Sequence, residues 1–154
     1  MSEVYQQAEE LLNDVFAASG FDLRATQLEV DSQTRIIEVD GSDAPLLRNE
    51  SGELLDSLES LINQIFSRSL HAGERIVCDV GGFRALRETE LRAMARHAAE
   101  RVRTSGLPFT FGAMNANERR VIHVSLADEA DLSTESVGEG NARRLMISKK
   151  AATT

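Results

Sequence analysis

Two side chains that could bind an anion stand four residues apart in the segment 114–123: Arg119 and His123. The segment has the pattern of a short helix, so both side chains should project from one face. Arginine is a permanent cation with a planar fork of donors, and imidazole can donate or accept near neutral pH. With Arg120 beside them, the pair suits a phosphate or a base edge. The spacing alone leaves another interpretation open, in which His123 hydrogen-bonds Arg119 or a carbonyl and completes a small core.

The helix that positions this pair is expected at about 115–127. Asn115 is a good N-cap, and Glu118 follows at the spacing of a capping box. Ile122 and Leu126 define the buried direction of the helix. The Arg–His pair falls at the border of that direction, where side chains are partly supported by packing and partly open.

Four further elements are expected around this helix: a long helix at about 83–104, a short strand at 109–111, and strands at about 132–137 and 143–148. The long helix carries arginines interleaved with glutamates, and a solvated face with local ion pairs is the simpler interpretation for most of them. These arginines are Arg84, Arg87, Arg92, Arg96 and Arg103. The phenylalanines of this region are expected in the core rather than as stacking platforms: Phe83, Phe109 and Phe111.

The first eighty residues predict six elements in the order helix, strand, strand, short helix, helix, strand. Their expected positions are 3–19, 22–30, 35–40, a turn from Asp43 and Pro45 to Arg48, a helix from Gly52, and 75–80. The turn 31–34 should join the two strands. The helix from Gly52 shows an apolar stripe made of Leu54, Leu58, Leu61, Ile62 and Ile65. Cys78 is most simply a buried strand residue.

The net charge of −8 hides a gradient along the chain. Residues 1–60 carry fourteen acidic and three basic side chains, a net charge of −11. Residues 61–123 carry six acidic and ten basic side chains, or +4, and residues 124–154 carry five and four, or −1. Because local fields act within roughly 10 Å in salt, the regional sign matters more than the total. An anionic partner is therefore expected at the middle segment.

The sequence carries no positive sign of catalysis. It has no nucleophile elbow, no Walker-type phosphate loop and no Rossmann glycine fingerprint. Its three histidines, His71, His97 and His123, are far apart and lack nearby Cys or paired carboxylate ligands. We therefore expect no enzyme, no metal and no cofactor. No apolar run is long enough for a membrane span, no signal peptide is expected, and the lone Cys78 fits a reducing cytoplasm.

The run Asn115 to His123 resembles the signature of the R-3-H domain, which is named for its Arg-x-x-x-His. More specifically, it resembles the form found in bacterial Jag (SpoIIIJ-associated) proteins, which pair a KH domain with an R-3-H domain. Three other stretches are similar to that family: 75–83 at the join of the domains, 103–108 before the next strand, and 136–144 at the closing hairpin with its Arg143-Arg144 pair.

Upstream, the predicted element order is the order of a type II KH domain, and Leu54–Leu58 resembles the helix after the KH clamp loop. That loop normally reads Gly-x-x-Gly, which lets the backbone approach phosphates closely. Here the aligned residues are Asn49, Glu50, Ser51 and Gly52, so the first glycine is missing and Glu50 brings a negative charge. Gly52 and the following helix N-terminus could still favour an anion. The family's separate N-terminal Jag domain is expected to be replaced by the 3–19 helix.

We therefore expect an α/β (α+β) protein with a type II KH-like module at 1–80, an R-3-H module at 81–148 and a disordered tail at 149–154. The resemblance implies binding of single-stranded nucleic acid, RNA in particular, with an impaired KH module. The expected binding residues are Arg119, Arg120, His123, Arg143 and Arg144. The alternative is a protein-interaction scaffold whose modules contact a protein, another KH protein being one such partner. RNA against DNA, the target sequence, the oligomeric state and the cellular process stay open.

Overall fold

The computed structural model describes residues 2–29 and 35–150 of the chain, in two compact units. Unit 1 is Met1–Arg84 and unit 2 is Ala85–Thr154. Each unit combines helices with its own three-stranded sheet, which confirms the expected mixed α/β fold. The predicted turn at 31–34 lies outside the described residues.

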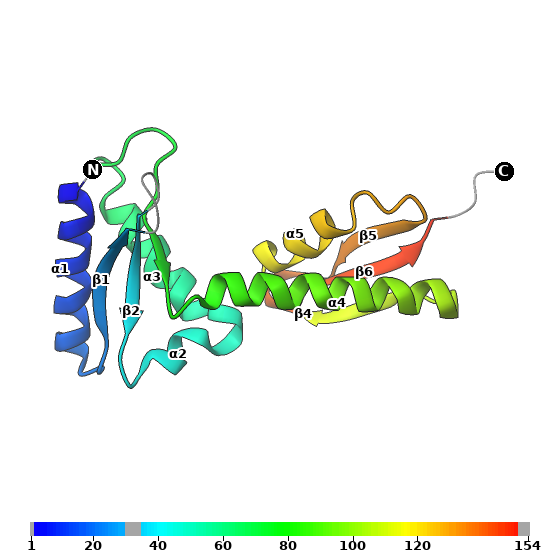
Figure 1. The fold of residues 1–154 in the computed structure, drawn as a ribbon, viewed down its shortest axis with the longest axis horizontal. Helices are drawn as coiled ribbons and strands as arrows, with labels where there is room; N and C mark the ends of the chain where they lie inside the picture. The colour runs from blue at the N-terminus through cyan, green and yellow to red at the C-terminus, as the bar shows by residue number, and fades with distance from the viewer. Residues whose placement is uncertain (1, 30–34, 151–154) are drawn as a thin grey trace. The chain divides into compact units, whose positions relative to one another are not determined.

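Unit 1 contains six regular elements in the predicted order (Figure 1). They are α1 (Ser2–Ser19), β1 (Arg24–Glu29), β2 (Arg35–Asp40), α2 (Ala44–Arg48), α3 (Glu53–Ile65) and β3 (Val77–Asp79), with a 3-10 turn at Asn49–Gly52 between the last two helices. The sheet order is β1-β2-β3, with β1 antiparallel and β3 parallel to β2. A parallel pair needs a crossover connection, and α2 and α3 supply it.

The core of unit 1 lies between α1, the sheet and α3. The apolar stripe predicted for α3 is wrong as a buried face, because Leu54, Leu61 and Ile65 are 45%, 48% and 51% exposed. The residues that α3 buries are instead Leu55, Glu59 and Ile62. Apolar periodicity located the helix, but the stripe it picked out leans to one side of the buried direction.

Glu59 is a charged residue inside this core, and it has a full set of partners. Its carboxylate is 8% exposed and accepts hydrogen bonds from the guanidinium groups of Arg75 and Arg84 and from the backbone N–H of Cys78. A buried carboxylate is tolerated when such donors compensate it. Cys78 is buried as predicted, and burial, with the nearby Glu59 charge, raises the pKa of its thiol to about 12.

Unit 2 packs two helices against an antiparallel sheet with the strand order β4-β6-β5 (Figure 1). Its elements are α4 (Phe83–Ser105), β4 (Phe109–Ala113), α5 (Ala116–Ser125), β5 (Leu132–Val137) and β6 (Arg144–Lys149), with a 3-10 turn at Gly140–Ala142. The first two residues of α4 belong to unit 1. One core joins α4, α5 and one face of the sheet, and Phe111, Ile122 and Ile147 are among its buried residues.

The end of β6 differs from the predicted disordered tail at 149–154. Lys149 is the last residue of β6 and pairs with Leu132 of β5. The backbone N–H of Lys150 donates to the carbonyl of Asp131 at 2.9 Å. The backbone therefore stays hydrogen-bonded through Lys150, and residues 151–154 lie outside the described part of the chain.

Candidate nucleic-acid interface

The N-terminus of α5 is fixed by a capping box, as its sequence predicts. The Asn115 side chain accepts from the Glu118 N–H at 2.9 Å, and the Glu118 carboxylate accepts from the Asn115 N–H at 3.3 Å. Glu118 is only 4% exposed and also accepts from the Nε of Arg87 on α4 at 2.8 Å. This carboxylate therefore ties the start of α5 to α4, a role that sequence reasoning missed beyond the cap itself.

Arg119 is half-buried and holds the loop that precedes the helix. Its Nη1 donates to the carbonyl of Met114 at 2.6 Å, and the Met114 N–H donates to the carbonyl of Arg143 at 2.9 Å. One edge of the guanidinium is thus used inside the protein. The other nitrogen atoms of the fork have no carboxylate partner in the described part of the chain.

Arg119, Arg120 and His123 occupy one sector of α5. At 3.6 residues per turn their side chains span about 100° of the helix surface, beside the buried direction marked by Ile122. His123 is exposed, and its Nδ1 lies 2.5 Å from the hydroxyl oxygen of Thr134 on β5. It does not hydrogen-bond Arg119 or a carbonyl as the alternative interpretation supposed. The imidazole is instead anchored at one nitrogen on the sheet.

The five predicted binding residues do not share one surface. Side chains alternate along an extended backbone, so Arg144 lies on the same face of the sheet as Met146, while Leu145 and Ile147 face the helices. The same alternation puts Arg143 on the side of Leu145, next to the start of α5. Arg143 therefore extends the α5 surface, and Arg144 starts from the opposite face.

The cations of this surface differ from those of α4 in their partners. Three arginines of α4 are neutralised by carboxylates, in the pairs Arg87–Glu118, Arg92–Glu88 and Arg103–Asp131. A fourth, Arg101, lies 5.3 Å from the ring centroid of Phe109. This confirms the expectation that ion pairs account for most arginines of the long helix.

Arg120, Arg143 and Arg144, by contrast, are exposed and have no ion-pair partner among residues 2–29 and 35–150. By unit, unit 1 carries sixteen carboxylates and six arginines, and unit 2 carries nine carboxylates and eleven basic side chains. The net charges are −10 and +2. The free positive charge is therefore concentrated around α5 and the start of β6.

The loop aligned with the KH clamp has an unusual backbone. Asn49 is extended, with φ −62 and ψ 153, so the position of the missing glycine does not require one. Glu50, Ser51 and Gly52 all have positive φ, at 49°, 61° and 84°. A Cβ on Gly52 would lie 2.7 Å from the ring of Phe83, so packing as well as conformation requires this glycine. The glycine that remains is explained without a phosphate.

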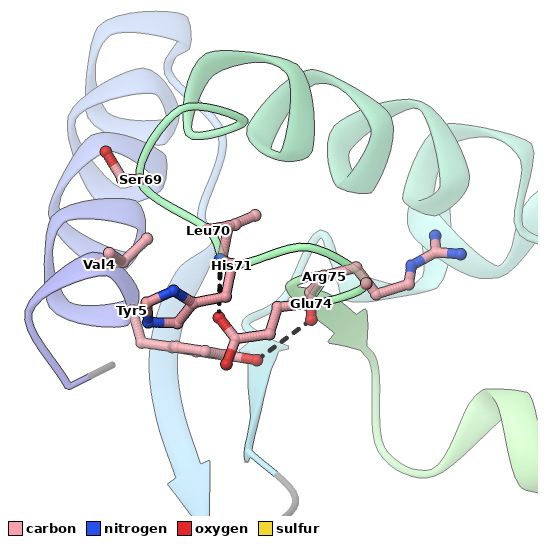
Figure 2. A pocket seen from close by; sticks show the side chains of 8 residues that line it. Val4, Tyr5, Ser69, Leu70, His71, Glu74 and Arg75 are labelled. Atoms are coloured by element: carbon pink, nitrogen blue, oxygen red, sulfur yellow. Dashed lines mark hydrogen bonds between the residues drawn. The ribbon is translucent and has the colours of Figure 1, made fainter.

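A hollow of about 280 Å³ lies elsewhere in unit 1, between the start of α1 and the loop before β3 (Figure 2). Figure 2 shows the Tyr5 hydroxyl donating to the carbonyl of Arg75, at 3.2 Å, and the His71 N–H donating to the Glu74 carboxylate, at 3.0 Å. Burial, aided by the Glu74 charge, raises the pKa of Tyr5. These groups satisfy one another and form no convergent set aimed at a ligand.

Two searches of the described residues were negative. No group of three or more His, Cys, Asp or Glu side chains is placed to hold a metal ion there. No helix in the same residues is both long and apolar enough to cross a membrane.

Residues 89–149 match the R-3-H domain family. Unit 2 contains an R-3-H domain. The match covers α5 together with all three strands of the sheet, so the resemblance seen in the sequence is confirmed for this part of the chain.

Two relatives extend the similarity beyond this domain. Over 146 residues, 94% of this chain and 65% of the relative, the chain is 29% identical to the RNA-binding protein KhpB of Clostridium symbiosum. It is 30% identical over 114 residues to the RNA-binding protein KhpB of Bacillus subtilis (strain 168), covering 73% of this chain and 55% of that protein. The chain spans less than two thirds of the length of either relative. The KH assignment of unit 1 stays a prediction.

Proposed function

We propose that the chain binds single-stranded nucleic acid, RNA in particular, through the R-3-H domain. The observation that carries the proposal is the set of exposed cations without carboxylate partners around the α5 N-terminus. The similarity to two proteins named as RNA-binding supports RNA as the ligand.

The binding surface we propose consists of Arg119, Arg120, His123 and Arg143. The Arg120 and Arg143 side chains are free to make charge-assisted hydrogen bonds with phosphate oxygens. Arg119 offers the edge of its fork that Met114 does not use. Phosphate contacts of this kind set the position of a strand without reading its sequence, so weak sequence preference is expected. Arg144 contributes only to a strand that passes around the end of the sheet.

The test uses Arg120→Gln with His123→Ala, and fluorescence anisotropy with a labelled mixed-sequence RNA at several salt concentrations. These positions are preferred to Arg119 because truncating Arg119 would also release the Met114 carbonyl. Removing two charge-assisted hydrogen bonds should weaken binding at least about tenfold. The dependence of log K on log salt should become shallower by about 0.7 for each phosphate that the variant no longer neutralises.

Arg96→Gln is the matched control for charge. Arg96 is exposed on α4 and has no ion-pair partner in the residues described, so this variant removes the same charge away from the proposed surface. It should bind almost as tightly as the unmodified chain. Equal affinity of Arg120→Gln/His123→Ala and the unmodified chain would refute the surface, and an equal loss in Arg96→Gln would reduce it to diffuse charge.

We also propose that unit 1 is a type II KH-like module whose loop does not clamp RNA. The element order and the similarity to KhpB across most of the chain support the module. The Glu50 carboxylate and the packing of Phe83 against Gly52 argue against a phosphate at the loop. Glu50→Ala should therefore leave RNA affinity unchanged in the same titration. A marked change would show that the loop takes part.

A second function, as a protein-interaction scaffold, is favoured by one observation. Leu54, Leu61 and Ile65 lie on one side of α3 and are each about half exposed. Such a stripe can receive an apolar surface of another protein. Leu54→Ser with Leu61→Ser should then abolish capture of a protein partner while RNA affinity stays unchanged. If capture by the chain survives this variant, α3 does not form the interface.

A further inference from the structure

The contact between His123 and Thr134 suggests how the imidazole is prepared for a polyanion. Thr134 is half-buried on β5, where it pairs with Ile147 of β6, and Ile147 is fully buried. Its backbone is therefore fixed in the sheet, and its β-branched side chain has few rotamers available. Its hydroxyl lies 2.5 Å from Nδ1 of His123. Nε2 is left without a partner among the described residues, on a ring that is exposed.

A hydroxyl differs from a carbonyl or a carboxylate at this place because it can both donate and accept. When the imidazole is neutral, the Thr134 hydroxyl can donate to Nδ1, and the ring proton then resides on Nε2. When the imidazole is protonated, Nδ1–H donates to the same hydroxyl oxygen, and Nε2 again carries a proton. In both states the outward nitrogen is a hydrogen-bond donor. A carbonyl at the same place would hold the proton on Nδ1 of the neutral ring and leave Nε2 an acceptor.

We infer that Thr134 is a positioning residue that keeps a proton on Nε2 of His123 and aims it at an acceptor oxygen of the nucleic acid. The inference rests on the proposed function of this surface. An acceptor nitrogen beside Arg119 and Arg120 would repel phosphate oxygens, whereas a donor adds a third hydrogen bond to the same group of atoms. His123 thereby works with the arginines both when neutral and when charged.

The experiment compares Thr134→Val, Thr134→Ser and His123→Ala, alone and with Thr134→Val, in the full chain with the same labelled RNA. Valine keeps the shape and the strand preference of threonine but removes the hydroxyl, and serine keeps the hydroxyl. Thr134→Val should weaken binding about three- to tenfold, the effect of one hydrogen bond, and Thr134→Ser should restore most of it. In the His123→Ala background, Thr134→Val should have no further effect, because both changes disrupt the same interaction.

Nitrogen-15 NMR of the imidazole gives a readout that a merely structural role for Thr134 would not move. In the unmodified chain, at a pH where the ring is neutral, the proton should be found on Nε2, and Thr134→Val should shift it toward a mixture of tautomers. A proton on Nδ1 of the unmodified chain overturns the inference, even if Thr134→Val does not fold. So does an equal loss from Thr134→Val with and without His123. If His123→Ala itself leaves RNA affinity unchanged, the proposed function fails at this residue, which is a distinct outcome.

Discussion

Replacing Glu118 by alanine should destabilise unit 2 far more than a surface glutamate substitution would. The Glu118 side chain is 5% exposed and accepts from Arg87 at Nε and Nη2, at 2.8 and 2.7 Å. It also accepts from the N–H of Asn115. Burial alone would lower the pKa of the Arg87 guanidinium, but hydrogen bonds to Glu118 and Glu90 outweigh burial and raise it.

The expected magnitude follows from these interactions. Hydrogen bonds between charged groups contribute about 1.5–3 kcal/mol, and the lower end applies because the Arg87 side chain is 27% exposed. Removal of the return bond of the capping box adds about 0.5 kcal/mol. Glu118→Ala should therefore lower the free energy of unfolding of unit 2 by about 2–3 kcal/mol. For a unit of this size, that lowers the thermal midpoint by about 10–20 °C.

Glu90→Ala is the matched control, because Glu90 pairs with the same arginine. That pair joins Nη1 to a carboxylate that is 52% exposed, at 3.2 Å and i,i+3 spacing. Exposed helix pairs of this kind contribute about 0.5 kcal/mol or less. Urea unfolding followed by circular dichroism measures both variants. If the two substitutions cost the same within about 0.5 kcal/mol, burial does not set the strength of the Glu118 pair and the reasoning is refuted.

Three other perturbations have defined outcomes. The Arg103 guanidinium donates to Asp131 and lowers the pKa of its carboxyl to about 2, so its contribution to stability is present above the ordinary value of 3.8 and is lost as the pH falls from there toward 2. Acid titration of Asp131→Asn should show less loss of stability across that range, and an unchanged profile would contradict the assignment. Cys78, with its raised thiol pKa, should react with a disulfide reagent only on unfolding, so fast labelling of the native chain would show that the strand opens. Glu50→Gly should increase the free energy of unfolding by about 0.5–1 kcal/mol in a urea titration, because φ 49° is strained for glutamate; a decrease would show that its side chain makes a favourable contact.

The helices and strands were largely predictable because local patterns specify them. Asn115 and Glu118 satisfy one another across three residues, and an interaction of that range is visible in the sequence. The alternation of Ile76, Cys78 and Val80 likewise indicated the buried face of a strand, and all three side chains are buried. In each case the residues that determine the structure are neighbours along the chain.

The buried face of α3 was not predictable from local patterns. A stripe of leucines suggested one face, yet α3 buries Glu59, because Arg75 and Arg84 approach it from elsewhere in the chain. Compensation of a buried charge depends on tertiary contacts that apolar periodicity does not contain. The contact of Thr134 with His123 was missed for the same reason, since it requires the packing of β5 beside α5.

The separation of Arg143 from Arg144 was predictable from the sequence. Two consecutive residues entering a strand project to opposite faces, and the predicted strand at 143–148 already placed both arginines at its start. Treating the pair as one basic patch ignored this alternation. The structure keeps Arg143 near the α5 N-terminus, through the Met114–Arg143 backbone hydrogen bond, and assigns Arg144 to the other face.

A net charge of −8 and a surface for a polyanion are compatible because the carboxylates and arginines are distributed differently. Most carboxylates lie in unit 1, and those facing α4 are already paired with its arginines. An arginine paired in this way contributes little field beyond its own partner, whereas an unpaired one attracts anions over a Debye length of roughly 8–10 Å. The capacity to bind a phosphate backbone is thus set by which cations lack partners, not by the sum of charges. That criterion selects the α5 N-terminus and Arg143, the same region in which Glu118 and Thr134 hold the polar side chains in place.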